Sequence, residues 1–128
     1  MAAVLAILGI VPVASGLSGI ILGPAGAPGG EPTTASVDSE YRFTNVFWFA
    51  AGIALWWSLF QPVERRKVTR AMLLIAAIGG IARLLSVLVS GWPHPVFIAA
   101  LVLELLVVPL VIWWHAHVTA TEKAARQP

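Results

Sequence analysis

Long runs of apolar residues alternate with short polar stretches along this 128-residue chain. A helix needs about 20 mostly apolar residues to cross a membrane. Four stretches reach or approach that length, and we predict a membrane-spanning helix in each. They cover about residues 2–22, 43–61, 71–90 and 95–115. Pro12 and Pro109 lie inside the first and the fourth, where helices packed in lipid tolerate a kink. The pattern predicts an all-α fold, an antiparallel bundle of four transmembrane helices.

The polar stretches between the spans predict three different links. Residues 23–42, GPAGAPGGEPTTASVDSEYR, read as a long loop whose second half opens the second helix, with Ser36 or Asp38 as N-cap. The second link, QPVERRKVTR, is short and basic, and the third, SGWPHP, is a tight turn. The tail, residues 116–128, is polar, and we expect it to fray.

Composition indicates the same class of protein. Hydrophobic residues make up 59% of the chain and charged residues 11%, whereas an ordinary globular domain carries about 25% charged residues. A small soluble domain leaves much of its surface exposed and could not hide so much apolar area. We therefore predict one integral membrane domain over residues 1–128. The absence of cysteine excludes disulfides and thiolate chemistry.

The positions of the basic residues predict the orientation. Lysine and arginine near span ends favour the cytoplasmic side. The second link and the tail hold Arg65, Arg66, Lys67, Arg70, Lys123 and Arg126, and the first and third links hold only Arg42. Both termini are therefore predicted to be cytoplasmic, in a multi-pass membrane protein. The net charge of +2 gives no reason to expect a nucleic-acid partner, because these residues flank apolar spans.

Arg83 is a charged residue inside the third span, in IAAIGGIARLLSVLV. It lies about 10 Å below the outer end of that span, and Glu104 lies about 14 Å below the same surface, at 1.5 Å per residue. The tight turn makes the two spans antiparallel neighbours. Either charge alone inside a membrane would cost about 2.5–3.5 kcal/mol or more. We predict that Glu104 pairs with Arg83 in the interior of the bundle.

Further polar residues are predicted at the same depth, in an outward-facing pocket. The predicted ligand-binding residues are Arg42, Asn45, Arg83, Ser86 and, at the rim, Glu40, with Glu104 as the candidate general acid or base. We expect no metal and no cofactor. His115 and His117, two residues apart, point from different faces of a helix and lie at the inner interface beside water and basic residues.

Simpler structural roles compete with this pocket. The Arg83–Glu104 pair acts equally well as a staple that fixes helix register. Arg42 and Glu40 are then interfacial residues that extend to water, and Asn45 hydrogen-bonds between helices. Stripes of small residues predict close helix packing or a homo-oligomer. They comprise Gly9, Ser15, Gly16 and Gly19 in the first span and Gly79 and Gly80 in the third.

One ordered set of motifs extends over nearly the whole chain. It consists of Arg42–Phe43, Gly79–Gly80–Arg83–Ser86, Gly91–Pro93 and Glu104–Pro109. This order resembles a bacterial family of small four-helix membrane proteins classed as a domain of unknown function. The resemblance implies the four-span fold and marks the same polar residues, but it supplies no substrate.

Three functions remain open on these observations. The first is a pocket for a lipophilic molecule whose polar or anionic head is held by Arg42 and Arg83, with proton transfer by Glu104 as in an isomerase or cyclase. The second is a structural or partner-binding membrane subunit. The third is a small anion transporter, which we rank last because the inner half of the predicted bundle is apolar.

Overall fold

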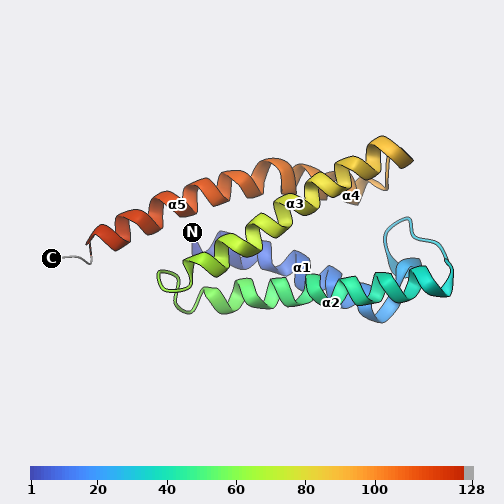
Figure 1. The fold of residues 1–128 in the computed structure, drawn as a ribbon, viewed down its shortest axis with the longest axis horizontal. Helices are drawn as coiled ribbons and strands as arrows, with labels where there is room; N and C mark the ends of the chain where they lie inside the picture. Colours follow the sequence, from blue (N-terminus) through green and yellow to red (C-terminus); the bar gives the residue numbers. More distant parts are fainter. Residues whose placement is uncertain (126–128) are drawn as a thin grey trace. The chain divides into compact units, whose positions relative to one another are not determined.

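The structure, a computed structural model, describes residues 1–125 of the chain. These residues form helices and loops, and none of them lies in a strand. They divide into two compact units, Met1–Phe60 and Gln61–Pro128 (Figure 1). Each unit is a helical hairpin, and we call them the first and the second hairpin. The predicted all-α class is confirmed over the described residues.

The first hairpin joins α1 (Ala2–Leu22) to α2 (Ala35–Ser58) through a 3-10 turn at Pro24–Gly26. Three glycines of α1, separated by seven and by three residues, face α2. Gly9 lies against Trp56, Gly16 against Phe49 and Gly19 against Asn45. The partner numbers fall as the glycine numbers rise, so the two helices run antiparallel.

Glycine lets the backbones of this hairpin approach closely. A Cβ atom on Gly16 would lie 2.7 Å from the backbone nitrogen of Phe49, so a side chain there would force the helices apart. Two indoles of α2 also bind α1. Trp56 donates to the carbonyl of Ala6 at 2.9 Å, and Trp48 donates to the hydroxyl of Ser15 at 2.9 Å. The small-residue stripe predicted on the first span therefore packs within the hairpin.

The second hairpin joins α3 (Arg66–Ser90) to a long helix that begins at Pro95. That helix consists of α4 (Pro95–Val102), a π-helical segment at Leu103–Val107 and α5 (Val108–Ala125). The turn between them contains Gly91, whose φ of 90° favours glycine. His94 is the N-cap of this helix, and its ring accepts a hydrogen bond from the backbone N–H of Val96.

The π-helical segment ends two residues before Pro109. Proline has no N–H to donate, and its ring collides with the carbonyl four residues earlier, here that of Leu105. In the widened turn the N–H of Val108 instead donates to the carbonyl of Leu103, five residues back. The proline predicted to kink the fourth span therefore follows a π-helical turn, and Glu104 lies in that turn.

Two predicted helix limits are wrong. The second helix begins at Ala35 with Thr34 as its N-cap, before the predicted Ser36 or Asp38, because the Thr34 hydroxyl accepts from the N–H of Val37. The tail predicted to fray over 116–128 is helical through Ala125. It contains no proline or glycine before that residue, and threonine hydroxyls bind carbonyls one turn back. Residues 126–128 lie outside the described part.

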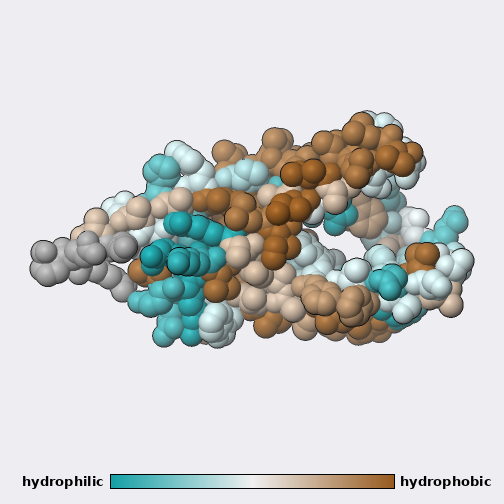
Figure 2. All heavy atoms as spheres, viewed as in Figure 1, coloured by the Kyte–Doolittle hydropathy of each residue, from teal (hydrophilic) through white to brown (hydrophobic). Residues whose placement is uncertain are grey.

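Among the described residues, three helices are long and apolar enough to cross a membrane: Ala2–Leu22, Arg66–Ser90 and Pro95–Thr121. The helix α2 is not one of them, and its first eight residues include Asp38, Glu40 and Arg42. The exposed surface is correspondingly rich in large apolar side chains. Figure 2 shows hydrophobic atoms over α4 and the end of α3, and hydrophilic atoms at the start of α3.

Candidate functional site

Arg83 and Glu104 form an ion pair between the two long helices of the second hairpin. The Nε of Arg83 donates to Oε2 of Glu104 at 2.9 Å. The side chain of Glu104 is 5% exposed and that of Arg83 is 36% exposed. The carboxylate is thus held in the packed interface between the helices, and the guanidinium extends outward from it. The predicted pairing of these two residues is confirmed.

The residues around the pair fix its position. A Cβ atom on Gly80 would lie 2.8 Å from Cβ of Glu104 and 2.9 Å from Cδ2 of Leu105, so only glycine lets the carboxylate approach α3 this closely. The guanidinium carbon of Arg83 lies 5.4 Å from the centre of the Phe97 ring, within the range of a cation–π contact. Glu104 and Phe97 therefore both contact the guanidinium of Arg83.

Most of the hydrogen-bonding capacity of Arg83 is unused. A guanidinium carries five N–H donors, and only Nε makes a hydrogen bond to any residue that the structure describes. No buried side-chain nitrogen or oxygen in that part of the chain lacks a partner, so the Nη groups are accessible. The pair thus presents up to four donors from Arg83 beside the second oxygen of Glu104.

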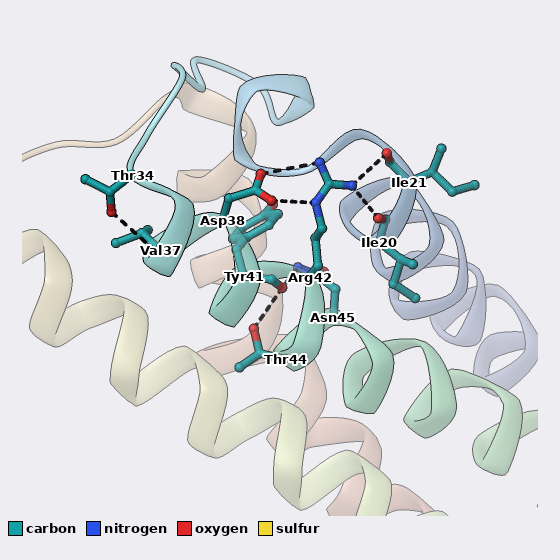
Figure 3. Close-up of polar contacts among 9 residues, drawn as sticks. All are labelled: Ile20, Ile21, Thr34, Val37, Asp38, Tyr41, Arg42, Thr44 and Asn45. Atoms are coloured by element: carbon teal, nitrogen blue, oxygen red, sulfur yellow. Dashed lines mark hydrogen bonds and ion pairs between the residues drawn. The ribbon is translucent and has the colours of Figure 1, made fainter.

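Arg42, in the first hairpin, has a different environment (Figure 3). It donates from Nε and Nη2 to the two oxygens of Asp38, at 2.7 and 3.3 Å. Its Nη1 donates to the carbonyls of Ile20 and Ile21, at 2.7 and 2.9 Å. Those carbonyls belong to the last turn of α1, which has no further backbone donors. Arg42 therefore caps α1 and ties it to α2.

The end of α1 has the shape that this cap requires. Gly23 follows α1 with φ 68° and ψ −168°, a conformation that side-chain-bearing residues avoid. A Cβ atom there would lie 2.5 Å from Nη2 of Arg42 and 2.7 Å from Oδ1 of Asp38. Gly23 therefore leaves the room at the end of α1 that the Arg42 and Asp38 side chains occupy.

The remaining predicted ligand-binding residues make local contacts or none. Asn45 donates from Nδ2 to the carbonyl of Tyr41 in its own helix at 2.8 Å and packs against Gly19. Glu40 and Ser86 are exposed on α2 and α3. Within the described part of the first hairpin no hydrogen bond or ion pair joins the side chains of Glu40, Arg42 and Asn45, and within the second hairpin the side chains of Arg83 and Glu104 meet. That all six share one pocket stays a prediction.

A second polar cluster in the second hairpin was not predicted. His115 was expected at an interface beside water, but it is 2% exposed. Its Nδ1 accepts from Nε of Arg70 at 3.4 Å, and Nη2 of Arg70 donates to the hydroxyl of Thr119 at 2.8 Å. The spacing of residues along the two helices could have predicted this cluster. Arg70 lies thirteen residues before Arg83 and His115 eleven residues after Glu104, so antiparallel helices paired at one must also meet near the other.

Comparison with known proteins identifies the family. Residues 1–115 match the family described as a domain of unknown function, DUF4345. The chain belongs to the DUF4345 family. No curated protein and no solved structure matches it significantly. The predicted resemblance to a family of unknown function is confirmed, and the match spans both hairpins. DUF4345 carries no described activity, so the chemistry of the site has to be argued from its residues.

Proposed function

We propose that this DUF4345 protein is an inner-membrane protein of bacteria that binds a lipophilic molecule by its polar head. In this proposal α2 is the fourth span, beside the three helices already long and apolar enough to cross a membrane. Both termini are cytoplasmic, because the link at the start of α3 is basic. Arg83 and Glu104 then lie in the outer half of the membrane, where a lipid-soluble ligand reaches them from the bilayer.

The unused donors of Arg83 carry this proposal. A pair that served only to fix helix register has no need of accessible N–H groups. Arg83 instead gives one donor to Glu104 and keeps its Nη groups available, in an apolar surface where water is scarce. A polar group in such surroundings is costly until it is hydrogen-bonded. A ligand head that accepts from the Nη groups removes that cost, and its apolar tail lies along exposed side chains such as Leu84 and Leu88.

The chemistry that we propose for Glu104 is proton transfer. Its buried carboxylate has one oxygen bonded to Arg83 and a second that accepts from no described residue. The carboxylate removes a proton from a head group held by Arg83, and the carboxylic acid formed in this way returns the proton at another atom of that group, as in an isomerase or cyclase. Arg42, by contrast, supports the fold in this proposal, since four of its donors already have acceptors.

Extraction of the purified protein tests the binding. Wild-type protein from native membranes, in mild detergent, is extracted with organic solvent and analysed by mass spectrometry beside Arg83→Gln. The matched control is Arg42→Gln, the same substitution in the first hairpin. A lipophile present in wild type and Arg42→Gln but lost in Arg83→Gln is the expected result. Only bulk phospholipid in all three would overturn the proposal and leave a register staple. Loss in both variants would extend the site to Arg42.

A further variant tests the proton transfer separately. Glu104→Gln keeps an oxygen that accepts from Arg83 but cannot donate and regain a proton at neutral pH. The lipophile extracted from it is therefore expected as the unreacted isomer, of equal mass but different double-bond position or ring number. The same isomer ratio in wild type and Glu104→Gln would overturn the chemistry and leave the binding intact.

A further inference from the structure

The charge and geometry of the Arg83–Glu104 pair restrict the head group that it can bind. We infer that this head is uncharged and accepts hydrogen bonds through a carbonyl-type oxygen, as in a ketone, a quinone or an ester. This inference rests on the proposed binding function and narrows it. It excludes the anionic head that a lone arginine would favour.

The geometry of the donors that remain on Arg83 limits the head groups that can bind there. Glu104 accepts from the Nε of the guanidinium, and the guanidinium carbon lies over the Phe97 ring at 5.4 Å from its centre. The Nη1–Nη2 edge is left, with two parallel N–H groups in the guanidinium plane. This edge suits either the two oxygens of an anion such as a carboxylate or phosphate, or a single carbonyl oxygen that accepts both bonds. Geometry alone does not choose between them.

Charge decides the choice. Arg83 and ionised Glu104 together carry no net charge, and they are 2.9 Å apart. An anion bound at the Nη edge would add an uncompensated negative charge beside a carboxylate in a medium of low dielectric constant, which is strongly unfavourable. A carbonyl oxygen gains the same two charge-assisted hydrogen bonds and leaves the sum at zero.

Within the second hairpin, no other described cation is near enough to change that sum. Along the two helices the next basic side chains from the pair are Arg70 and His115 on one side and His94 on the other. They are thirteen, eleven and ten residues away, which is roughly 15–20 Å at 1.5 Å per residue. Arg70 moreover binds His115 and Thr119. The pair therefore keeps its neutral sum within the second hairpin.

Three probes with the same 14-carbon chain test the inference. They are methyl myristate, with an ester head, tetradecanesulfonate, with a permanent negative charge, and tetradecane, with no head. Each is added at a few mole per cent to nanodiscs that contain the protein. Binding is read from the rise in unfolding temperature and from native mass spectrometry. Wild type is expected to prefer the ester over the sulfonate by at least about tenfold, or 1.4 kcal/mol.

Glu104→Gln makes the test sharper, because it leaves Arg83 with its charge uncompensated. In this variant the preference is expected to reverse in favour of the sulfonate. If the variant does not fold, the wild-type comparison still decides. Wild-type preference for the sulfonate, or equal binding of both, would overturn the inference but leave the binding function. Failure of both probes to bind better than tetradecane would overturn the binding function itself.

Discussion

Arg42 and Arg83 are each paired with a carboxylate at the helix interface of one hairpin, yet their surroundings differ. Their side chains are almost equally exposed, 39% and 36%. Arg42 makes four hydrogen bonds, two to Asp38 and two to the end of α1. Arg83 makes one, to Glu104. Exposure alone therefore does not distinguish the two arginines, whereas the number of occupied donors does.

The two carboxylates, unlike the two arginines, differ strongly in exposure. Asp38 is 38% exposed and lies one turn from Arg42 in the same helix, so the pair forms locally. Glu104 is 5% exposed and comes from a helix that meets Arg83 only through tertiary packing. The Asp38 pair adds to a helix that can form without it. The Glu104 pair depends on the register between α3 and the long helix that begins at Pro95.

The largest expected effect is the loss of the buried carboxylate. Glu104→Ala leaves Arg83 without its counter-charge, and removal of one member of a buried pair costs about 3 kcal/mol or more. Asp38→Ala, the matched change in the first hairpin, is expected to cost less than half as much, because Arg42 keeps the carbonyls of Ile20 and Ile21. The free energy of unfolding in detergent micelles measures both. Equal losses would remove the distinction between the two pairs.

The next effect concerns the glycine beside the Arg42 cap. Gly23→Ala and Gly91→Ala both place a side chain at a positive φ, at 68° and 90°, which costs about 1–3 kcal/mol. Only at Gly23 would the new Cβ meet the Arg42 and Asp38 side chains, since no heavy atom lies within 4 Å at Gly91. Thermal unfolding should show the larger loss for Gly23→Ala. A larger loss for Gly91→Ala would contradict the cap.

Two adjacent glycines on α3 test the packing of Glu104. Gly80→Ala brings a Cβ to 2.8 Å from that of Glu104 and is expected to cost about 1–3 kcal/mol. Gly79→Ala meets nothing within 4 Å and is expected to gain up to about 1 kcal/mol from helix propensity. Chemical unfolding of the two variants gives the difference. The same sign for both would mean that Gly80 does not set the approach of Glu104.

The smallest effect belongs to Arg70, which resembles Arg42 in having structural partners. Thr119→Val removes the acceptor of one Arg70 donor in a buried position and is expected to cost about 1 kcal/mol. Thr121→Val removes a similar hydroxyl that is exposed and bonds only to the carbonyl of His117, so the change should stay within about 0.5 kcal/mol. If the two variants have the same unfolding midpoint, the hydrogen bond from Arg70 to Thr119 does not contribute to stability.

The sequence by itself determined the helices, because the information for a helix in lipid is local. Runs of apolar residues predicted α1, α3 and the helix that begins at Pro95, and the match in depth predicted the Arg83–Glu104 pair across a tight turn. The predicted N-cap of α2 and the frayed tail were wrong, because each depends on which particular hydroxyl finds a partner. Thr34 caps α2, and Thr119 binds both the carbonyl of His115 and the side chain of Arg70.

Only the tertiary structure decided which polar groups are already satisfied. Nothing in the residue types of Arg42 and Arg83 says that one caps the carbonyls of another helix and the other keeps its Nη groups accessible. That outcome depends on where α1 ends, on Gly23 and on the close approach at Gly80. The burial of His115 likewise follows from the register that the Arg83–Glu104 pair shares with Arg70. Helix formation is a property of neighbouring residues, whereas the use of each hydrogen-bond donor depends on residues distant in the sequence.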